Sequence, residues 1–432
     1  MYIYTVRPGD TLYQVALRNG IDPQAILAVN SIADPNRLVP GEALIIPVAG
    51  GMTTHTVRPG ESLWSIAQSE GVPPERLQAA NPIPPGALLP GEEVVVPTVT
   101  PPARQSVEVN AYVVVAVGEL DLPMVTRMVN DLTYISLFDY RYDAAGVITP
   151  PPGSAAAAAA LRRAGLGPLA VITDFDGTNF SPDLARAVMS DPVRTRAVSN
   201  ALSVSQAQNL AGVLVDFENM YPADRPQYNT FIRTLTGQLR PAGLLLALAV
   251  APKASDMPDQ PWIGAFDYQT LGSLADRVNL MTYEWGWVGG PPRAVAPVNL
   301  VEQVVLYALK LMPPEKIWLG IPLYGYDWPL PRREGELAAR VSPQGARNLA
   351  VERGVDIRYD GLAQSPWFRY TDETGRDHEV WFEDARSILA KFNLIRRYGL
   401  RGPSYWTLDT GFTQNWVLQR QYFDVRRFAP AA

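Results

Sequence analysis

The sequence predicts an α/β fold in which a (β/α)8 TIM barrel with an inserted α+β lobe follows two copies of a small β-α-α-β module. Three observations support this prediction. The N-terminal quarter contains an internal repeat, strand-like and helix-like segments alternate after it, and one late connection is far longer than the others. At 432 residues the chain is long enough for a large barrel and small modules, so we expect several domains.

Composition limits the kinds of function. The chain is 47% hydrophobic and 19% charged, and no apolar run approaches the roughly 20 residues that cross a bilayer, so we expect a soluble protein with no membrane partner. Its net charge of −6 gives no basic surface for nucleic acid. Cysteine is absent and only His55 and His378 carry imidazoles, which argues against a metal centre. We expect no metal and no other cofactor.

The internal repeat defines two modules, 1–49 and 53–98. The segment TVRPGDTL (5–12) recurs as TVRPGESL (56–63), and the ends of the modules, PGEALIIP and PGEEVVVP, also correspond. Each module is predicted to form a strand, a Pro-Gly turn, two helices and a closing strand. Both resemble LysM domains, and this resemblance implies binding of a glycan that contains N-acetylglucosamine.

The LysM resemblance places the glycan in a shallow groove between two loops of each module. The residues expected to contact it are Gly9, Asp10, Thr11 and Ile32 in the first module and Gly60, Glu61, Ser62 and Ile83 in the second. The glycines and hydroxyls have a second explanation, as turn and helix-cap residues, and the two roles are compatible.

A proline-rich stretch, 99–106, predicts a semi-rigid linker to a third domain at 107–432. In that domain β-rich segments alternate with helical ones, as in a (β/α)8 barrel. The strands are expected at 109–117, 134–138, 169–173, 212–217, 244–251, 278–282, 317–323 and 402–408. Because the connection between the last two is long and contains its own helix at 343–353, residues 326–379 are expected to form the inserted α+β lobe.

Two carboxylates end the fourth predicted strand. Asp216 and Glu218 are separated by one residue, so strand alternation puts both on one face. Two acids held that close cannot both ionise at low cost, and one is pushed toward holding a proton, as an acid catalyst requires. Two solvated acids at a strand end are the simpler explanation for such a pair in isolation.

Acidic and aromatic residues follow later strands, at the end of the barrel where such enzymes carry their active sites. The segments are MTYEWGW (281–287), YGYDW (324–328) and SYW (404–406). Carboxylates bind sugar hydroxyls and aromatic rings stack on sugar C–H faces. This set of residues therefore indicates a carbohydrate-binding site, in preference to aromatic side chains that only pack in the core. Three further strand-end charges are explained equally well as barrel-mouth ion pairs: Asp139, Asp174 and Lys253.

From about residue 107 the chain resembles the glycoside hydrolases of family 18, and within them the LysM-bearing N-acetylglucosaminidases of bacterial spores. The family signature D-G-x-D-x-D-x-E is kept at Gly212, Asp216 and Glu218. Ala211 and Leu214 stand where its other acids would be. The chain therefore lacks, at 214, the buried acid with which the equivalent of Asp216 shares a proton in chitinases.

The family resemblance implies a retaining, substrate-assisted mechanism. Glu218 would protonate the glycosidic oxygen while the 2-acetamido oxygen of the sugar attacks its own anomeric carbon. Asp216 would accept from the acetamido N–H and Tyr283 would donate to the acetamido oxygen. The residues expected to bind the substrate are Trp406, Glu284, Tyr326, Asp327 and Met281.

The expected function is hydrolysis of β-1,4 bonds in spore cortex peptidoglycan by a monomeric N-acetylglucosaminidase that its LysM modules hold on the glycan. The alternatives are a chitinase acting on a chitin-like glycan and a non-catalytic glycan-binding spore coat protein. The N-terminus MYIYTV lacks the basic start and apolar core of a signal peptide. Unless this is a mature form, the protein is expected to be made in the cytoplasm and to act at the spore coat or cortex, associated with the cell wall.

Overall fold

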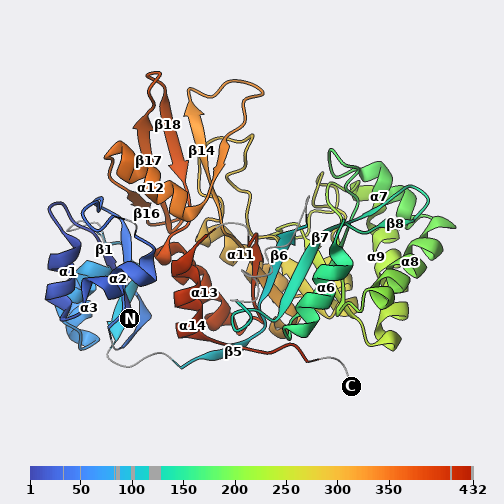
Figure 1. Ribbon diagram of the computed structural model, residues 1–432, viewed down its shortest axis with the longest axis horizontal. Helices are drawn as coiled ribbons and strands as arrows, with labels where there is room; N and C mark the ends of the chain where they lie inside the picture. Colours follow the sequence, from blue (N-terminus) through green and yellow to red (C-terminus); the bar gives the residue numbers. More distant parts are fainter. Residues whose placement is uncertain are drawn as a thin grey trace.

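The computed structural model describes residues 1–32, 34–48, 50–81, 83, 88–98, 103–115, 128–408 and 411–429. The N-terminal modules lie on one flank of the barrel, and a separate lobe rises above the barrel on the same side (Figure 1). Within these described residues no helix has the length and apolar character needed to cross a bilayer.

The two modules share one β-α-α-β order. The first contains β1 (Tyr2–Thr5), α1 (Leu12–Asn19), α2 (Pro23–Asn30) and β2 (Ala43–Ile46); the second contains β3 (Gly51–Thr56), α3 (Leu63–Ser69), α4 (Pro74–Ala80) and β4 (Glu93–Thr98). The two strands of each module pair antiparallel. The hydroxyls of Thr11 and Ser62 cap the first helix of each module by accepting main-chain N–H bonds.

A buried asparagine joins the second helix to the closing strand in each module. The Asn30 amide donates to the carbonyls of Ile26 and Ile45, and its oxygen accepts from the Ile45 N–H, at 2.7–2.8 Å. Asn81 makes the same three bonds in the second module. This repeated residue therefore satisfies buried backbone groups, which accounts for its presence at matching positions.

The predicted barrel is confirmed. Its parallel strands follow the order β6-β7-β9-β10-β11-β12-β13-β19, and pairing of β19 with β6 closes the sheet. The strands are β6 (Asn110–Val114), β7 (Tyr134–Tyr142), β9 (Gly167–Thr173), β10 (Gly212–Asp216), β11 (Leu245–Val250), β12 (Arg277–Leu280), β13 (Ile317–Pro322) and β19 (Gly402–Trp406), and β8 (Ile148–Thr149) forms a hairpin with β7. Each overlaps its predicted segment, although residues 116–117 of the first prediction lie outside the described residues.

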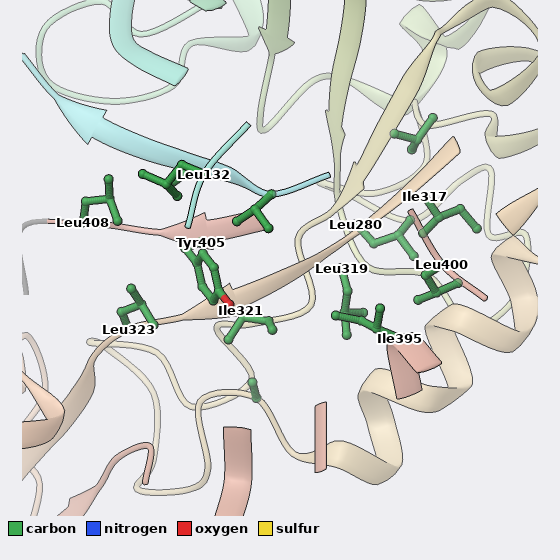
Figure 2. Close-up of a cluster of buried hydrophobic side chains, with 14 of the residues drawn as sticks. Leu132, Leu280, Ile317, Leu319, Ile321, Leu323, Ile395, Leu400, Tyr405 and Leu408 are labelled. Carbon is green, nitrogen blue, oxygen red and sulfur yellow. The ribbon is translucent and has the colours of Figure 1, made fainter. Parts of the chain in front are cut away.

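Helices surround the barrel. They are α6 (Ser154–Arg163), α7 (Pro182–Met189), α8 (Val193–Ala207), α9 (Arg225–Leu239), α10 (Tyr268–Leu274), α11 (Val298–Ala308), α13 (Ala385–Tyr398) and α14 (Thr413–Tyr422). Strand alternation divides the core, because Ile317, Leu319 and Ile321 of β13 point outward into one cluster with Ile395 of α13 (Figure 2). Trp318, between them, is fully buried inside the barrel.

The inserted lobe is an antiparallel sheet with strand order β15-β14-β18-β17-β16. Its elements are β14 (Gly325–Leu330), β15 (Ala339–Val341), α12 (Pro343–Arg353), β16 (Arg358–Asp360), β17 (Ser365–Thr371) and β18 (Asp377–Trp381). Ala346 and Ala350 of α12 pack against Phe368 and Val380 on one face of this sheet. The predicted helix at 343–353 and the α+β character of the insertion are confirmed.

The linker prediction needs a correction. Residues 99–102 lie outside the described residues, but β5 (Gln105–Val107) pairs in parallel with β20 (Phe423–Val425) near the other end of the chain. The end of the expected linker is thus part of the barrel domain, because its main-chain groups bond to the C-terminal segment.

The first module is docked on the barrel domain. Gln414 of α14 donates to the Asn30 side chain and the Ala43 carbonyl, at 2.9 and 2.7 Å. Gly41 has φ +81°, and a Cβ there would lie 1.7 Å from the Ile357 carbonyl oxygen, so the close contact with the lobe requires glycine.

Candidate active site

Strand β10 brings the two predicted acids to the C-terminal end of the barrel. Leu214 points into the barrel, and Asp216, two residues on, is 4% exposed. Phe217 points outward instead and stacks on Phe231 of α9, with ring centroids 5.5 Å apart. Glu218 follows Asp216 by two residues, so the alternation that buries Phe217 among the helices keeps the acids on the interior side.

Electrostatics separates the roles of these two carboxyls. Burial raises the pKa of Asp216 to about 7. The pKa of Glu218 is raised well above its usual range, first by burial and then by the neighbouring carboxyls of Asp216, Asp174 and Glu284. Glu218 therefore keeps its proton at neutral pH, as a general acid requires.

Asp174 directly follows β9 and lies beside Glu218. Its Oδ1 accepts the Glu218 main-chain N–H at 3.0 Å, and its side chain is fully buried. Burial, and then the charges of Asp216 and Asp176, raise the pKa of Asp174 to about 8. Among the described residues it makes no ion pair, so the ion-pair explanation does not hold for it.

The other two strand-end charges do form ion pairs. Asp139 bonds to Arg141 at 2.7 Å, and the buried Lys253 bonds to Asp256 at 2.8 Å. Packing and charge compensation account for both.

Aromatic residues surround the acids. Trp406 meets Tyr112 and Phe138 edge-on, with centroids 5.1 and 5.2 Å away. It also packs, with Tyr283, against the aromatic cluster of the lobe, and Met281 belongs to the barrel-interior cluster on which both rings lie. The predicted residues Trp406, Tyr283 and Met281 are thus brought together.

Two site residues escaped the sequence analysis. Asn279 of β12 is fully buried and donates to the Tyr112 hydroxyl at 3.1 Å, and burial, followed by the Asp216 charge, raises the pKa of Tyr112. Both residues lie within predicted strands, whereas the motifs that predict the site lie at the strand ends. The available signal was a polar side chain at an inward-facing strand position.

Glu284 and Tyr326 are joined directly. The hydroxyls of Tyr324 and Tyr326 both donate to Glu284 Oε1, the second at 3.0 Å. Burial raises the pKa of Glu284, and its charge in turn raises that of Glu218, which places it near the acid. Glu284 has φ +66°, a left-handed conformation that non-glycine residues seldom adopt outside turns and functional sites.

The prediction for Asp327 was wrong. Its carboxylate accepts from the Tyr370 hydroxyl and bonds to His378 Nδ1, each at 2.7 Å, inside the lobe. On β14 the side chains alternate, so Tyr326 joins the aromatic face while Asp327 points to the opposite face. Its oxygens are engaged away from the acids.

The LysM loops also differ from expectation. Ile32 is only 7% exposed and packs in the core, so the prediction that it contacts glycan is contradicted. The Asp10 carboxylate accepts from the Arg7 N–H and the Tyr4 hydroxyl, and the Glu61 carboxylate accepts from the Arg58 N–H.

These acids hold their own loops, since each closes the turn that contains a glycine with positive φ, Gly9 or Gly60. Gly9, Thr11, Gly60 and Ser62 are exposed. Ile83 lines a cavity of about 880 Å³ between the two modules and the lobe.

Across the residues that the structure describes, no three His, Cys, Asp or Glu side chains are grouped so as to hold a metal ion.

Comparison with known proteins decides the family. The model for glycosyl hydrolases family 18 matches residues 157–411, and the LysM domain model matches residues 4–47 and 55–97. The chain belongs to glycosyl hydrolases family 18. It is a glycosidase with two LysM domains, and both resemblances inferred from the sequence are confirmed.

Two similar proteins span nearly the whole chain, and a third spans about three quarters of it. The cortical fragment-lytic enzyme of Bacillus subtilis (strain 168) is 38% identical over 98% of this chain and 99% of its own length. The crystal structure of the Bacillus cereus spore cortex-lytic enzyme SleL superposes with a TM-score of 0.84 at 37% identity, covering 98% of each chain. A chitinase from Chromobacterium violaceum has a TM-score of 0.67 at 29% identity, covering 73% of this chain and 98% of its own.

Proposed function

We propose that this family 18 enzyme is an N-acetylglucosaminidase that hydrolyses β-1,4 bonds in spore cortex peptidoglycan or its fragments. The observation that carries the proposal is the placement of Asp216 and Glu218 together at the end of β10, where burial and the neighbouring carboxyls raise the pKa of Glu218 well above its usual range. The likeness over nearly the full length to a cortical fragment-lytic enzyme supports the choice of substrate. LysM modules that bind N-acetylglucosamine would keep a monomeric enzyme on the cell wall.

The geometry supports a substrate-assisted route. Glu218 gives its proton to the glycosidic oxygen as the C1–O bond breaks, and the sugar's acetamido oxygen forms a new bond to C1. Asp216 accepts from the acetamido N–H and so favours the cyclic oxazolinium ion. The Tyr283 hydroxyl, whose pKa burial raises well above its usual range, stays protonated and can donate to the acetamido oxygen. Water then adds to C1 as the bond between C1 and the acetamido oxygen breaks, which restores the acetamido group, and the water gives a proton to Glu218.

Substrate binding is assigned to the residues that surround the acids. Trp406, supported edge-on by two aromatic rings, offers a face on which the sugar can stack. Glu284 and Tyr326, already bonded to each other, can bind hydroxyls. In the modules, the exposed first loops and Ile83 are the proposed glycan contacts.

Glu218→Gln tests the acid. The variant keeps the shape but cannot transfer the proton, so turnover of cortex fragments should fall by roughly 10²–10⁴-fold while glycan binding persists. Asp259→Asn, at an exposed acid in the loop after β11, is the control and should remain active. Near-normal turnover by Glu218→Gln would refute the assignment.

The substrate and the chemistry need separate measurements. Purified cortex fragments should be cleaved in preference to chitin oligosaccharides; the reverse result would favour the second candidate, a chitinase, which the likeness to the Chromobacterium enzyme keeps open. The first product should be the β-anomer, a thiazoline mimic of the oxazolinium should inhibit, and de-N-acetylated glycan should resist cleavage. An inverted first product, seen by NMR, would exclude the substrate-assisted route.

A further inference from the structure

A fully buried carboxyl lies beside the proposed acid without a basic partner. Asp174 belongs to the loop after β9, the strand next to β10 in the barrel, where Thr173 pairs with Asp216. Its Oδ1 accepts the main-chain N–H of Glu218 at 3.0 Å. Among the described residues, its buried Oδ2 has no hydrogen-bond partner, and neither has the buried Oδ1 of Asp216.

The barrel interior offers no alternative acid on β10. Leu214, which precedes Asp216 on the inward face, is fully buried and apolar. Asp174 approaches the same pair from the neighbouring strand. We propose that Asp174 is a positioning residue for the acid, because its carboxyl fixes the backbone at Glu218 and supplies the buried partner carboxyl that position 214 does not. This inference rests on the proposed function of Glu218.

The charges around Asp174 fit this role. The groups that interact with it are Asp216 at the end of β10, Glu218 just beyond that strand, Asp176 from its own loop and Tyr228 from α9, and none of them is basic. Its pKa of about 8 means that Asp174 loses its proton just above neutral pH. Once charged, it opposes ionisation of Glu218 and so keeps the acid protonated to higher pH.

Two substitutions separate position from charge. Asp174→Asn keeps an oxygen that can accept the Glu218 N–H but cannot ionise, so kcat at the optimum should hold while the alkaline limb of kcat/KM moves down by about one pH unit. Asp174→Ala also removes the acceptor, and kcat should fall by roughly tenfold with KM unchanged. Asp259→Asn, at an exposed acid in the loop after β11, should leave the profile as in the wild type.

A second measurement does not depend on hydrolysis. Titration of the Glu218 carboxyl by ¹³C NMR in glutamate-labelled protein, assigned by its loss in Glu218→Gln, should show a lower pKa in Asp174→Asn than in the wild type or Asp259→Asn. Identical titrations and identical pH profiles in all three proteins would overturn the inference. A wild type that cleaves no N-acetylglucosamine glycan would overturn the proposed function instead, and the NMR titration would still decide the role of Asp174.

Discussion

Glu42 of the first LysM module and Arg347 of the lobe helix α12 form a buried two-pronged ion pair. Arg347 Nε and Nη2 lie 2.7 and 3.2 Å from the two carboxylate oxygens, and Glu42 is 3% exposed. Burial raises the pKa of Glu42, and Arg347 opposes that change. Because a buried charge needs its partner, the first module is anchored to the lobe rather than only tethered through the linker.

Breaking this pair should destabilise the protein. Arg347→Ala leaves the Glu42 carboxyl buried without its partner, and the free energy of unfolding should fall by roughly 3–5 kcal/mol. Urea denaturation monitored by tryptophan fluorescence measures the loss. The control is Arg353→Ala, at the end of the same helix. This variant removes a surface ion pair with Glu373 and should change stability little. Equal losses in both variants would show that the Glu42 pair does not anchor the module.

The stability of the loop after the first strand of the second LysM module should depend on pH, whereas that of the matching loop in the first module should not. His55 bonds to Glu61 at 2.7 Å and to Glu70 at 2.8 Å, and these carboxylates, Glu61 first, raise its pKa above 6.5. A raised histidine pKa stabilises the loop fully below 6.5, and this contribution is lost as pH rises through the folded pKa.

Amide hydrogen exchange around Arg58 and Gly60, corrected for intrinsic rates, should therefore show weaker protection at alkaline pH. His55→Tyr introduces the residue found at the matching position of the first module, Tyr4, and should remove the pH dependence. The first-module loop, held by Arg18 and Asp10, is the internal control. Parallel pH responses in the two loops would contradict the prediction.

Glu218→Gln should raise thermal stability while it lowers turnover. The native pKa of Glu218 lies well above its ordinary 4.5, so the folded chain holds a proton that the unfolded chain releases. This lowers wild-type stability as pH rises above the unfolded pKa toward the folded one. Glutamine carries no such penalty, so the difference in melting temperature should grow from acidic to neutral pH. A constant difference across this range would mean that Glu218 ionises normally.

Two acids, Glu284 after barrel strand β12 and Asp327 on lobe strand β14, have different expected effects. Glu284→Gln alters a carboxyl bonded to Tyr324 and Tyr326 near the acids, so KM should rise with little loss of stability. Asp327→Asn disturbs the contacts with Tyr370 and His378, so the melting temperature should fall while KM stays near normal. Steady-state kinetics and thermal denaturation of both variants separate the two roles, and a raised KM in Asp327→Asn alone would reverse them.

Local patterns determined the strands, the repeat and the acid pair. Alternation along β10 predicted that Asp216 and Glu218 share a side, because a period of two needs no knowledge of distant contacts. The Pro-Gly turns and cap residues predicted both modules for the same reason: Thr11 and Ser62 act on main-chain groups three residues away. The extra length between β13 and β19 was sufficient to predict the lobe.

Tertiary contacts decided what lies around those elements. Asp174 and Glu218 are 44 residues apart, and only the pairing of β9 with β10 brings them together. The sequence predicted that Asp327 and Ile32 bind glycan. In the structure Asp327 is bonded to Tyr370 inside the lobe, and Ile32 is covered by the core of its module. Sequence periodicity specifies which side of an element a residue takes, whereas its burial and pKa depend on the segment packed against that side.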